Sequence, residues 1–192
     1  MSRKEASPAG GTMKGKMCAA LLFCLMLTAC SDTEDYYASE KAFLRFTPVT
    51  AAAPLYRALN NPGMFCSVTV SNSMYYFKGA DGTSASYPTT ALEVYGQVEC
   101  VAGFVIGTPS VPDLSGSYTP MAFDLVCPSC YEDTYIVRSL SFSDNEELSC
   151  ARCGRVYDLT NSGIVIEGEE GTKLYRYHLT YSSSADLVLV QN

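Results

Sequence analysis

Short apolar runs separated by turn residues fill the chain from about residue 43 onward, and this pattern predicts a β-rich fold. The runs are rich in β-branched and aromatic residues, as strands are. They lie at residues 65–70, 74–77, 94–98, 104–106 and 186–190. Clusters with glycine, such as residues 79–82, separate the runs and predict turns. Many short strands at close spacing are typical of an antiparallel β-sandwich or a small β-barrel.

The clearest strand is predicted at residues 174–181, where apolar and polar residues alternate. Because side chains point to alternate faces of a strand, one face carries the larger residues. These are Tyr175, Tyr177, Leu179 and Tyr181. His178 falls on the opposite, more polar face. It is the only histidine of the chain, and we interpret it as a surface or hydrogen-bonded residue, not as a catalytic residue or a ligand.

A helix is predicted only at residues 51–59. Pro54 can occupy its first turn, and the Asn-Asn-Pro-Gly run at residues 60–63 ends it. The sequence therefore predicts an all-β domain, an antiparallel sandwich or small barrel, with at most one short helix.

Residues 1–29 carry the features of a cleaved export signal. Lys14 and Lys16 precede an uncharged apolar run at residues 17–27, which is shorter than the roughly 20 residues that a helix needs to span a bilayer. The sequence Leu-Thr-Ala-Cys, which ends at Cys30, resembles the lipobox of bacterial lipoproteins, in which the cysteine receives the lipid and becomes the mature N-terminus. We therefore expect Cys30 to be the lipid attachment site and Met13 to be the true start. An ordinary signal peptide followed by an incidental cysteine is the alternative.

The chain after the leader is predicted to consist of an acidic tether, residues 30–42, and a β domain, residues 43–192. The net charge of the whole chain is −7, and removal of the basic leader makes it more negative. This charge argues against nucleic-acid binding and against a basic patch that holds anionic lipids, so the lipid itself must provide the membrane attachment. We expect a lipid-anchored protein of the cell envelope, at the outer membrane, on its periplasmic or surface face. The acidic run after Cys30 resembles a surface-display signal of some Gram-negative lineages, and a solvated linker explains it equally well.

Two C-x-x-C motifs carry the candidate chemistry. We call residues 127–130 (Cys-Pro-Ser-Cys) the first knuckle and residues 150–153 (Cys-Ala-Arg-Cys) the second knuckle. A two-residue gap lets both sulfurs of a tight turn face one point, and two such turns on neighbouring hairpin loops can supply four thiolates in a tetrahedron. Gly154 can adopt the positive φ that such a turn requires. The predicted metal ligands are Cys127, Cys130, Cys150 and Cys153.

Three states of these four sulfurs remain open. Zinc suits four thiolates and needs no open position when its role is structural. Iron, alone or as a two-iron two-sulfur cluster, also accepts four cysteines and would make the site an electron carrier. In an oxidising compartment the same sulfurs could instead form two disulfides. We favour zinc because of its affinity for thiolates.

Cys66 and Cys100 lie outside the two knuckles, on separate predicted strands. They could form a disulfide with each other, or they could be two small buried apolar residues.

The residues around the second knuckle resemble the second cluster-binding loop of Rieske iron–sulfur domains. In that family C-x-x-H-G leads into an aromatic–aspartate pair, a turn with glycine, and a strand that begins with leucine. The corresponding places here are taken by Gly154, Tyr157, Asp158, Gly163 and Leu174. Residues 123–128 are similar to the strand that enters the first Rieske loop. The resemblance covers residues 121–192, and it implies a Rieske-like β domain of the kind found in exported lipoproteins with all-cysteine knuckles.

The chain departs from the Rieske pattern at the ligands. A Rieske centre uses two cysteines and two histidines, whereas Cys153 and Ser129 stand here in the histidine positions. Because His178 is the only histidine, a mixed cysteine and histidine cluster cannot form. A two-iron cluster held by four cysteines would have a reduction potential well below Rieske values.

The sequence favours a non-enzymatic role. No residue near His178 in the sequence makes it part of a hydrolytic triad, and the acidic groups at Glu146, Glu147 and residues 167–170 lie in predicted turns. A thiol–disulfide exchange motif normally opens a helix, and no helix is predicted at either knuckle. Two functions remain: an interaction or assembly module with a structural metal and an unidentified protein partner in the envelope, or an iron-containing electron carrier that acts as a component of an oxidoreductase.

Overall fold

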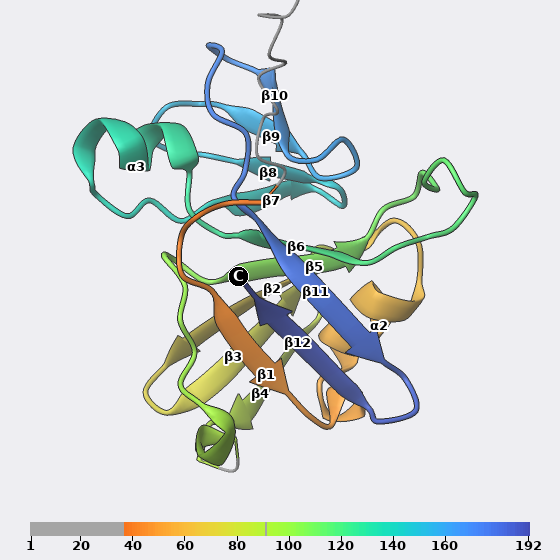
Figure 1. Cartoon of the computed structure of the whole chain (residues 1–192). Coiled ribbons are helices and arrows are strands. Elements are labelled where there is room, and N and C mark those ends of the chain that lie inside the picture. The colour runs from red at the N-terminus through yellow and green to blue at the C-terminus, as the bar shows by residue number, and fades with distance from the viewer. Residues whose placement is uncertain (1–36, 91) are drawn as a thin grey trace, which may run out of the picture. The chain divides into compact units, whose positions relative to one another are not determined.

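The computed structural model describes residues 37–90 and 92–192, and within these ranges the chain is almost entirely β (Figure 1). Twelve strands form two antiparallel sheets in the described part, accompanied by two short α-helices. The predicted all-β class is therefore confirmed.

The larger sheet has eight strands in the described residues, in the order β1-β12-β11-β6-β5-β2-β3-β4. They are β1 (Phe43–Phe46), β2 (Met64–Ser71), β3 (Met74–Gly79), β4 (Ser84–Pro88), β5 (Phe104–Thr108), β6 (Met121–Asp124), β11 (Arg176–Ser182) and β12 (Leu187–Gln191). Phe46 on β1 contacts the rings of Tyr75, Phe77 and Tyr87 on β3 and β4, with centroids 4.7 to 5.5 Å apart. Because β1 and β4 are the two edges of the sheet, these contacts show that it curls towards a barrel.

The smaller sheet has four strands in the order β10-β9-β8-β7, all of them among the described residues. They are β7 (Ser141–Asp144), β8 (Glu147–Ser149), β9 (Val156–Asp158) and β10 (Ile164–Glu167). This sheet and the helix α3 (Pro128–Thr134) lie together at one end of the β domain, near the point where β6 ends (Figure 1).

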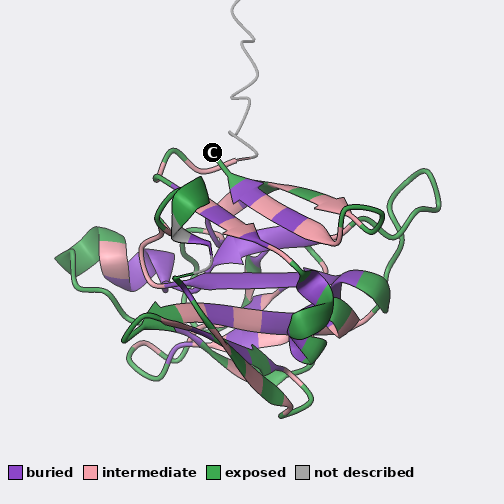
Figure 2. Cartoon of the chain, turned by 90° about the horizontal axis from the view of Figure 1, so that it is seen from below, coloured by how far each residue is buried: buried purple, intermediate pink, exposed green. Residues whose placement is uncertain are grey.

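The described residues form two hydrophobic cores. The first fills the inside of the curled sheet, where Cys66, Ile106 and Tyr177 are buried in one cluster with the apolar side chains of the helix α2 (Ala53–Asn60). The second lies between the two sheets and includes Phe123 from the larger sheet and Tyr157 from the smaller one. Buried and exposed residues alternate along several strands, as Figure 2 shows, while β5 is buried at every position because both of its faces are covered.

Most of the predicted elements are present. Residues 65–70, 74–77, 104–106 and 186–190 correspond to β2, β3, β5 and β12, residues 174–181 to β11, and residues 51–59 to α2. The strand predicted at residues 94–98 is wrong, because this segment forms the 3-10 turn Glu93–Tyr95 followed by Gly96 at φ +124°. Val94 is 81% exposed, so its β-branched side chain has no core to pack against.

Two details of the β domain differ from the expectation. A second short helix, α3, forms at the first knuckle, where Pro128 occupies the first turn and pre-sets its φ. The prediction that neither knuckle opens a helix, which was the argument against a thiol–disulfide exchange motif, is therefore wrong for the first knuckle. Residues before position 43 also contact the β domain: Tyr37 stacks on His178 with ring centroids 3.6 Å apart, and the Ala38 N–H donates to the Arg176 carbonyl at 2.9 Å. Residues 37–42 thus pack on the β domain, although they were predicted to be part of the tether.

Within the described residues no helix is both long and apolar enough to cross a membrane. The predicted leader, the start at Met13 and the lipid attachment site Cys30 lie outside the described residues.

Candidate metal centre

The first knuckle leaves the larger sheet at the end of β6 and turns directly into α3. The Cys127 N–H donates to the Arg138 carbonyl at 2.8 Å, and Val126 forms an antiparallel bridge with Ser139. The Cys127 carbonyl accepts from the Tyr131 N–H at 3.0 Å, which starts the helix. The chain therefore leaves and returns as in a hairpin, but its loop contains a helix, whereas an ordinary hairpin loop was predicted.

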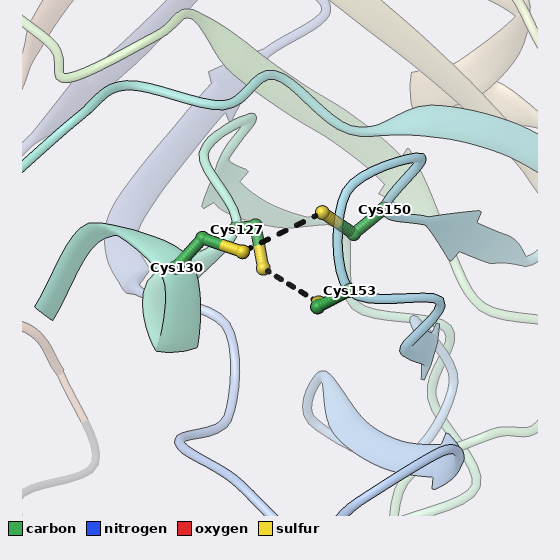
Figure 3. Close-up of side chains that lie close together, drawn as sticks. All are labelled: Cys127, Cys130, Cys150 and Cys153. Carbon is green, nitrogen blue, oxygen red and sulfur yellow. Dashed lines mark hydrogen bonds between the residues drawn. The ribbon is translucent and has the colours of Figure 1, made fainter. Parts of the chain in front are cut away.

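The second knuckle is the tight turn between β8 and β9, as predicted. The Cys150 N–H donates to the Arg155 carbonyl, and its carbonyl accepts from the Gly154 N–H, both at 2.9 Å. Gly154 has a φ of +74°, a conformation that glycine adopts without the steric penalty of a Cβ atom. The turn thus places both of its cysteines towards the first knuckle (Figure 3).

The four predicted ligands meet at one point. All four Sγ atoms lie within 4.8 Å of one another. The Sγ atoms of Cys127 and Cys153 are 3.7 Å apart, and those of Cys130 and Cys150 are 3.9 Å apart (Figure 3). All four are free thiols, so the alternative of two disulfides is not the state of this structure. Cys153 is half-buried, and the other three are buried within the second core.

Hydrogen-bond donors surround the sulfurs. The hydroxyl of Tyr157, which is buried, lies 3.3 Å from the Cys127 Sγ. Arg155 lies beside Cys153. Its guanidinium is held in place because its Nε donates to the Glu169 carbonyl at 2.9 Å and its Nη2 to the Glu170 carbonyl at 3.2 Å. The backbone N–H and the side chain of Arg155 are the strongest of the hydrogen-bond donors that lower the pKa of Cys153.

These surroundings shift the pKa values of the thiols in different directions. Burial raises the pKa of Cys127 and that of Cys130. Burial also acts to raise the pKa of Cys153, but the backbone N–H and the guanidinium of Arg155 outweigh it and lower this pKa to about 6. Cys153 is therefore a thiolate at neutral pH, while Cys127 and Cys130 must lose protons before they can bind a metal.

Metal affinity is accordingly expected to rise with pH. Between pH 6 and pH 8, each proton that a metal displaces from a thiol strengthens binding by about tenfold per pH unit, because less free energy is spent on deprotonation. Cys153, with a pKa of about 6, contributes little to this slope above pH 7. Competition with a chromophoric chelator, corrected for the protonation of the chelator, measures the effect. An affinity independent of pH would contradict the assigned ligands.

The loop after β10 passes over the first knuckle at Gly171. A Cβ atom at this position would overlap the Ser129 Oγ and lie 2.9 Å from the Arg155 Nε. Glu132 on α3 holds the same loop, because its carboxylate accepts from the Thr172 hydroxyl at 2.5 Å and from the Tyr175 hydroxyl at 3.0 Å. Any larger residue at position 171 would therefore force the side chain of Ser129 or Arg155 to move.

Replacing Gly171 by alanine is expected to weaken metal binding and to lower the free energy of unfolding by about 1–3 kcal/mol, because the new methyl group crowds Ser129 and Arg155. Unfolding in urea measures the effect. The double variant Gly171→Ala with Ser129→Ala removes the overlapping oxygen and should recover part of the loss. If it recovers nothing, the crowding is not at Ser129.

Asp124 is a buried residue close to the first knuckle that the sequence analysis did not single out. Its carboxylate is fully buried and accepts backbone N–H bonds from Val101 at 2.8 Å, Ala102 at 3.1 Å and Val126 at 2.9 Å, and an O–H bond from Tyr177 at 3.2 Å. Burial raises the pKa of this carboxyl, and the four donors oppose the rise. Asp124 thereby fixes the path of the chain into the first knuckle. Its signal in the sequence was an acidic residue inside an apolar strand.

The remaining candidates lie away from the centre. Cys66 and Cys100 are free thiols, and both contact the first core; this agrees with the second alternative, apolar packing. Burial raises the pKa of Cys66 to about 12 and that of Cys100 to about 11. His178 is exposed on β11, as predicted. Glu146 lies in the turn before β8, where it accepts hydrogen bonds from the Ser110 N–H and hydroxyl, both at 2.7 Å.

Comparison with known proteins adds no assignment. No protein-family model matches the chain, and no curated protein matches its sequence. The resemblance to Rieske domains therefore stays a prediction, and the chemistry of the site must be argued from its own residues.

Proposed function

We propose that this protein is a non-enzymatic, lipid-anchored module of the cell envelope, in which Cys127, Cys130, Cys150 and Cys153 hold one structural zinc ion. The observation that carries the proposal is the convergence of four sulfurs, from two loops distant in sequence, on one point. The metal would join the first knuckle to the second and so tie α3 and the smaller sheet to the larger one.

The spacing of the sulfurs supports a single ion. A Zn–S bond of about 2.3 Å places tetrahedral sulfurs about 3.8 Å from one another. The contacts of 3.7 Å and 3.9 Å agree with this value. A two-iron cluster would instead insert a second iron and two bridging sulfides between the pairs of cysteines, so sulfurs that all lie within 4.8 Å of one another favour one ion over such a cluster.

The donor set supports a structural role. Four thiolates complete a tetrahedron and leave no position for a substrate or water, as is typical of structural zinc sites. The second core holds three of the ligands in place, and Asp124 and Gly171 fix the chain around them. A closed site of this kind would stabilise the fold, and it would offer no open position at which a substrate could react.

A single iron ion in the same four sulfurs is the second candidate. One observation favours it: Cys153 is half-buried, so an electron could reach the site from the surface through its sulfur. The protein would then relay single electrons to an oxidoreductase partner in the envelope. The scaffold would be Rieske-like under either proposal, with the mixed cluster replaced.

The membrane attachment proposed here rests on Cys30 and the export signal before it. The acidic charge of the chain, −7 overall, supports attachment by lipid and not by a basic surface. The role at the membrane would be interaction or assembly with a protein partner. Growth with labelled fatty acid tests the anchor: the Cys30→Ser variant should lose the label, and a labelled variant would refute this attachment site.

Metal analysis of the purified chain, combined with its visible absorption, tests the metal. A colourless protein with one zinc ion per chain would support the module. A red-brown protein with one iron ion would support the electron relay. Purification with neither metal, together with failure to bind added zinc, would refute both.

A further inference from the structure

We propose that the two knuckles are also an oxidative modification site, in which loss of the metal lets the four cysteines form two disulfides that cross from one knuckle to the other, Cys127 with Cys153 and Cys130 with Cys150. The inference rests on the proposed function, because it describes what happens when that site loses its ion.

The pairing follows from the geometry of the sulfurs. The contacts of 3.7 Å and 3.9 Å each join one knuckle to the other, as the two dashed lines in Figure 3 show. A disulfide bond is about 2.05 Å long, so each pair must close by only about 2 Å. Backbone hydrogen bonds already hold both turns: the Cys127 N–H donates to Arg138 and the Cys150 N–H to Arg155.

Crossed disulfides would take over the role of the metal. The paired cysteines are 26 and 20 residues apart in the chain. Bonds across these separations restrict the unfolded chain more than bonds across the two-residue gap of one knuckle. They would also keep α3 attached to the β8–β9 turn, whereas disulfides within each knuckle would leave the two loops free to separate.

The reaction is thiol–disulfide exchange with a small-molecule disulfide. The Cys153 thiolate is half-buried while the other three ligands are buried, so it attacks one sulfur of the reagent, breaks its S–S bond and releases one thiol. The Cys127 thiol then loses its proton, attacks the Cys153 sulfur and releases the second thiol. Two electrons pass from the protein to the reagent for each disulfide formed, and the two released thiolates take up two protons, one lost by Cys127 and one from the solvent. The same exchange at Cys130 and Cys150 consumes a second reagent molecule. A dithiol reverses both steps.

The test is to oxidise the full chain with oxidised glutathione after a chelator has removed the metal, to block free thiols, and to map the peptides after trypsin. Trypsin cleavage places the ligands in three peptides: Cys127 and Cys130 fall in peptide 79–138, Cys150 in peptide 139–152 and Cys153 in peptide 153–155. Crossed pairing joins all three peptides into one species. A link between 139–152 and 153–155 alone, or the absence of any link among the three, would overturn the proposal.

Two single variants separate the two possible crossed pairings. Cys127→Ser should leave peptide 79–138 joined to 139–152 through Cys130, with Cys153 free. Cys130→Ser should join 79–138 to 153–155, with Cys150 free. The reverse pattern would overturn the stated pairing. If either variant does not fold, the species from the unaltered chain still decides between crossed and local disulfides.

Cys100 shares peptide 79–138 with the first knuckle, so Cys100→Ser is the matched control and should leave the three-peptide species unchanged. Loss of the three-peptide species in this variant would assign the link to Cys100 and overturn the proposal.

Metal content, measured on the same preparation before the chelator is added, tests the proposed function separately. A chain that binds no metal but forms crossed disulfides refutes the structural zinc only, and one that binds zinc without forming them refutes this inference only.

Discussion

Replacing Cys127 by serine is expected to lower the free energy of unfolding of the metal-loaded protein by several kcal/mol, on the order of 3–5. Serine is a poor ligand for a thiophilic ion, and the three remaining sulfurs would hold it weakly. The metal would then no longer join the first knuckle to the second, and the core that the two sheets share would be weakened there. Cys153→Ser should have the same effect. Urea unfolding in the presence of excess zinc measures it.

A metal-removal experiment completes this prediction. A strong chelator should bring the unaltered protein down to the stability of Cys127→Ser and should change the variant itself very little. Cys100→Ser is the control, because Cys100 is a half-buried thiol outside the centre, and it should change the free energy of unfolding by less than about 1 kcal/mol. Equal losses in both variants would show that any cysteine substitution destabilises the fold. Unchanged unfolding in Cys127→Ser would exclude a structural metal.

The ligand set could be predicted from the sequence because its geometry is local. A two-residue gap places two sulfurs of one turn on the same side whatever the rest of the chain does. The only long-range requirement was that the knuckles meet: the first follows β6 of the larger sheet, the second joins β8 to β9 of the smaller sheet, and the second core packs them together. The larger strands were predictable for a related reason, since alternation in residues 174–181 places Tyr177 inside and His178 outside.

The features that could not be predicted depend on contacts distant in sequence. Residues 94–98 have the composition of a strand, but no strand of the described part of the chain pairs with them. The next residue, Glu99, forms an isolated bridge with Phe43. The helix α3 is short and mostly polar, so no apolar periodicity marks it. The close approach of Gly171 to Ser129 likewise exists only once the loop has folded over the knuckle.

Asp124→Ala is expected to lower the free energy of unfolding by about 3–5 kcal/mol. The carboxylate accepts from three backbone N–H groups, those of Val101, Ala102 and Val126. A buried N–H without a partner costs about 1–3 kcal/mol, and the costs of neighbouring groups are not fully additive. Metal affinity should also fall, because the Val126 N–H bond fixes the residue before the first knuckle. Urea unfolding and zinc competition measure the two effects.

Asp113 provides the control that separates burial from the number of hydrogen bonds. Its carboxylate accepts from Ser115, Ser117 and Thr119 in a loop that is fully exposed. Water can replace a lost acceptor there, whereas the site of Asp124 is closed to it, so Asp113→Ala should have a much smaller effect on unfolding and none on zinc binding. Asn at position 124 keeps one oxygen but turns an NH₂ group towards Val101 or Val126, so Asp124→Asn should lie between the two alanine variants. If Asp124→Ala and Asp113→Ala were equally mild, the buried carboxylate would not be what holds the chain on its path into the metal centre.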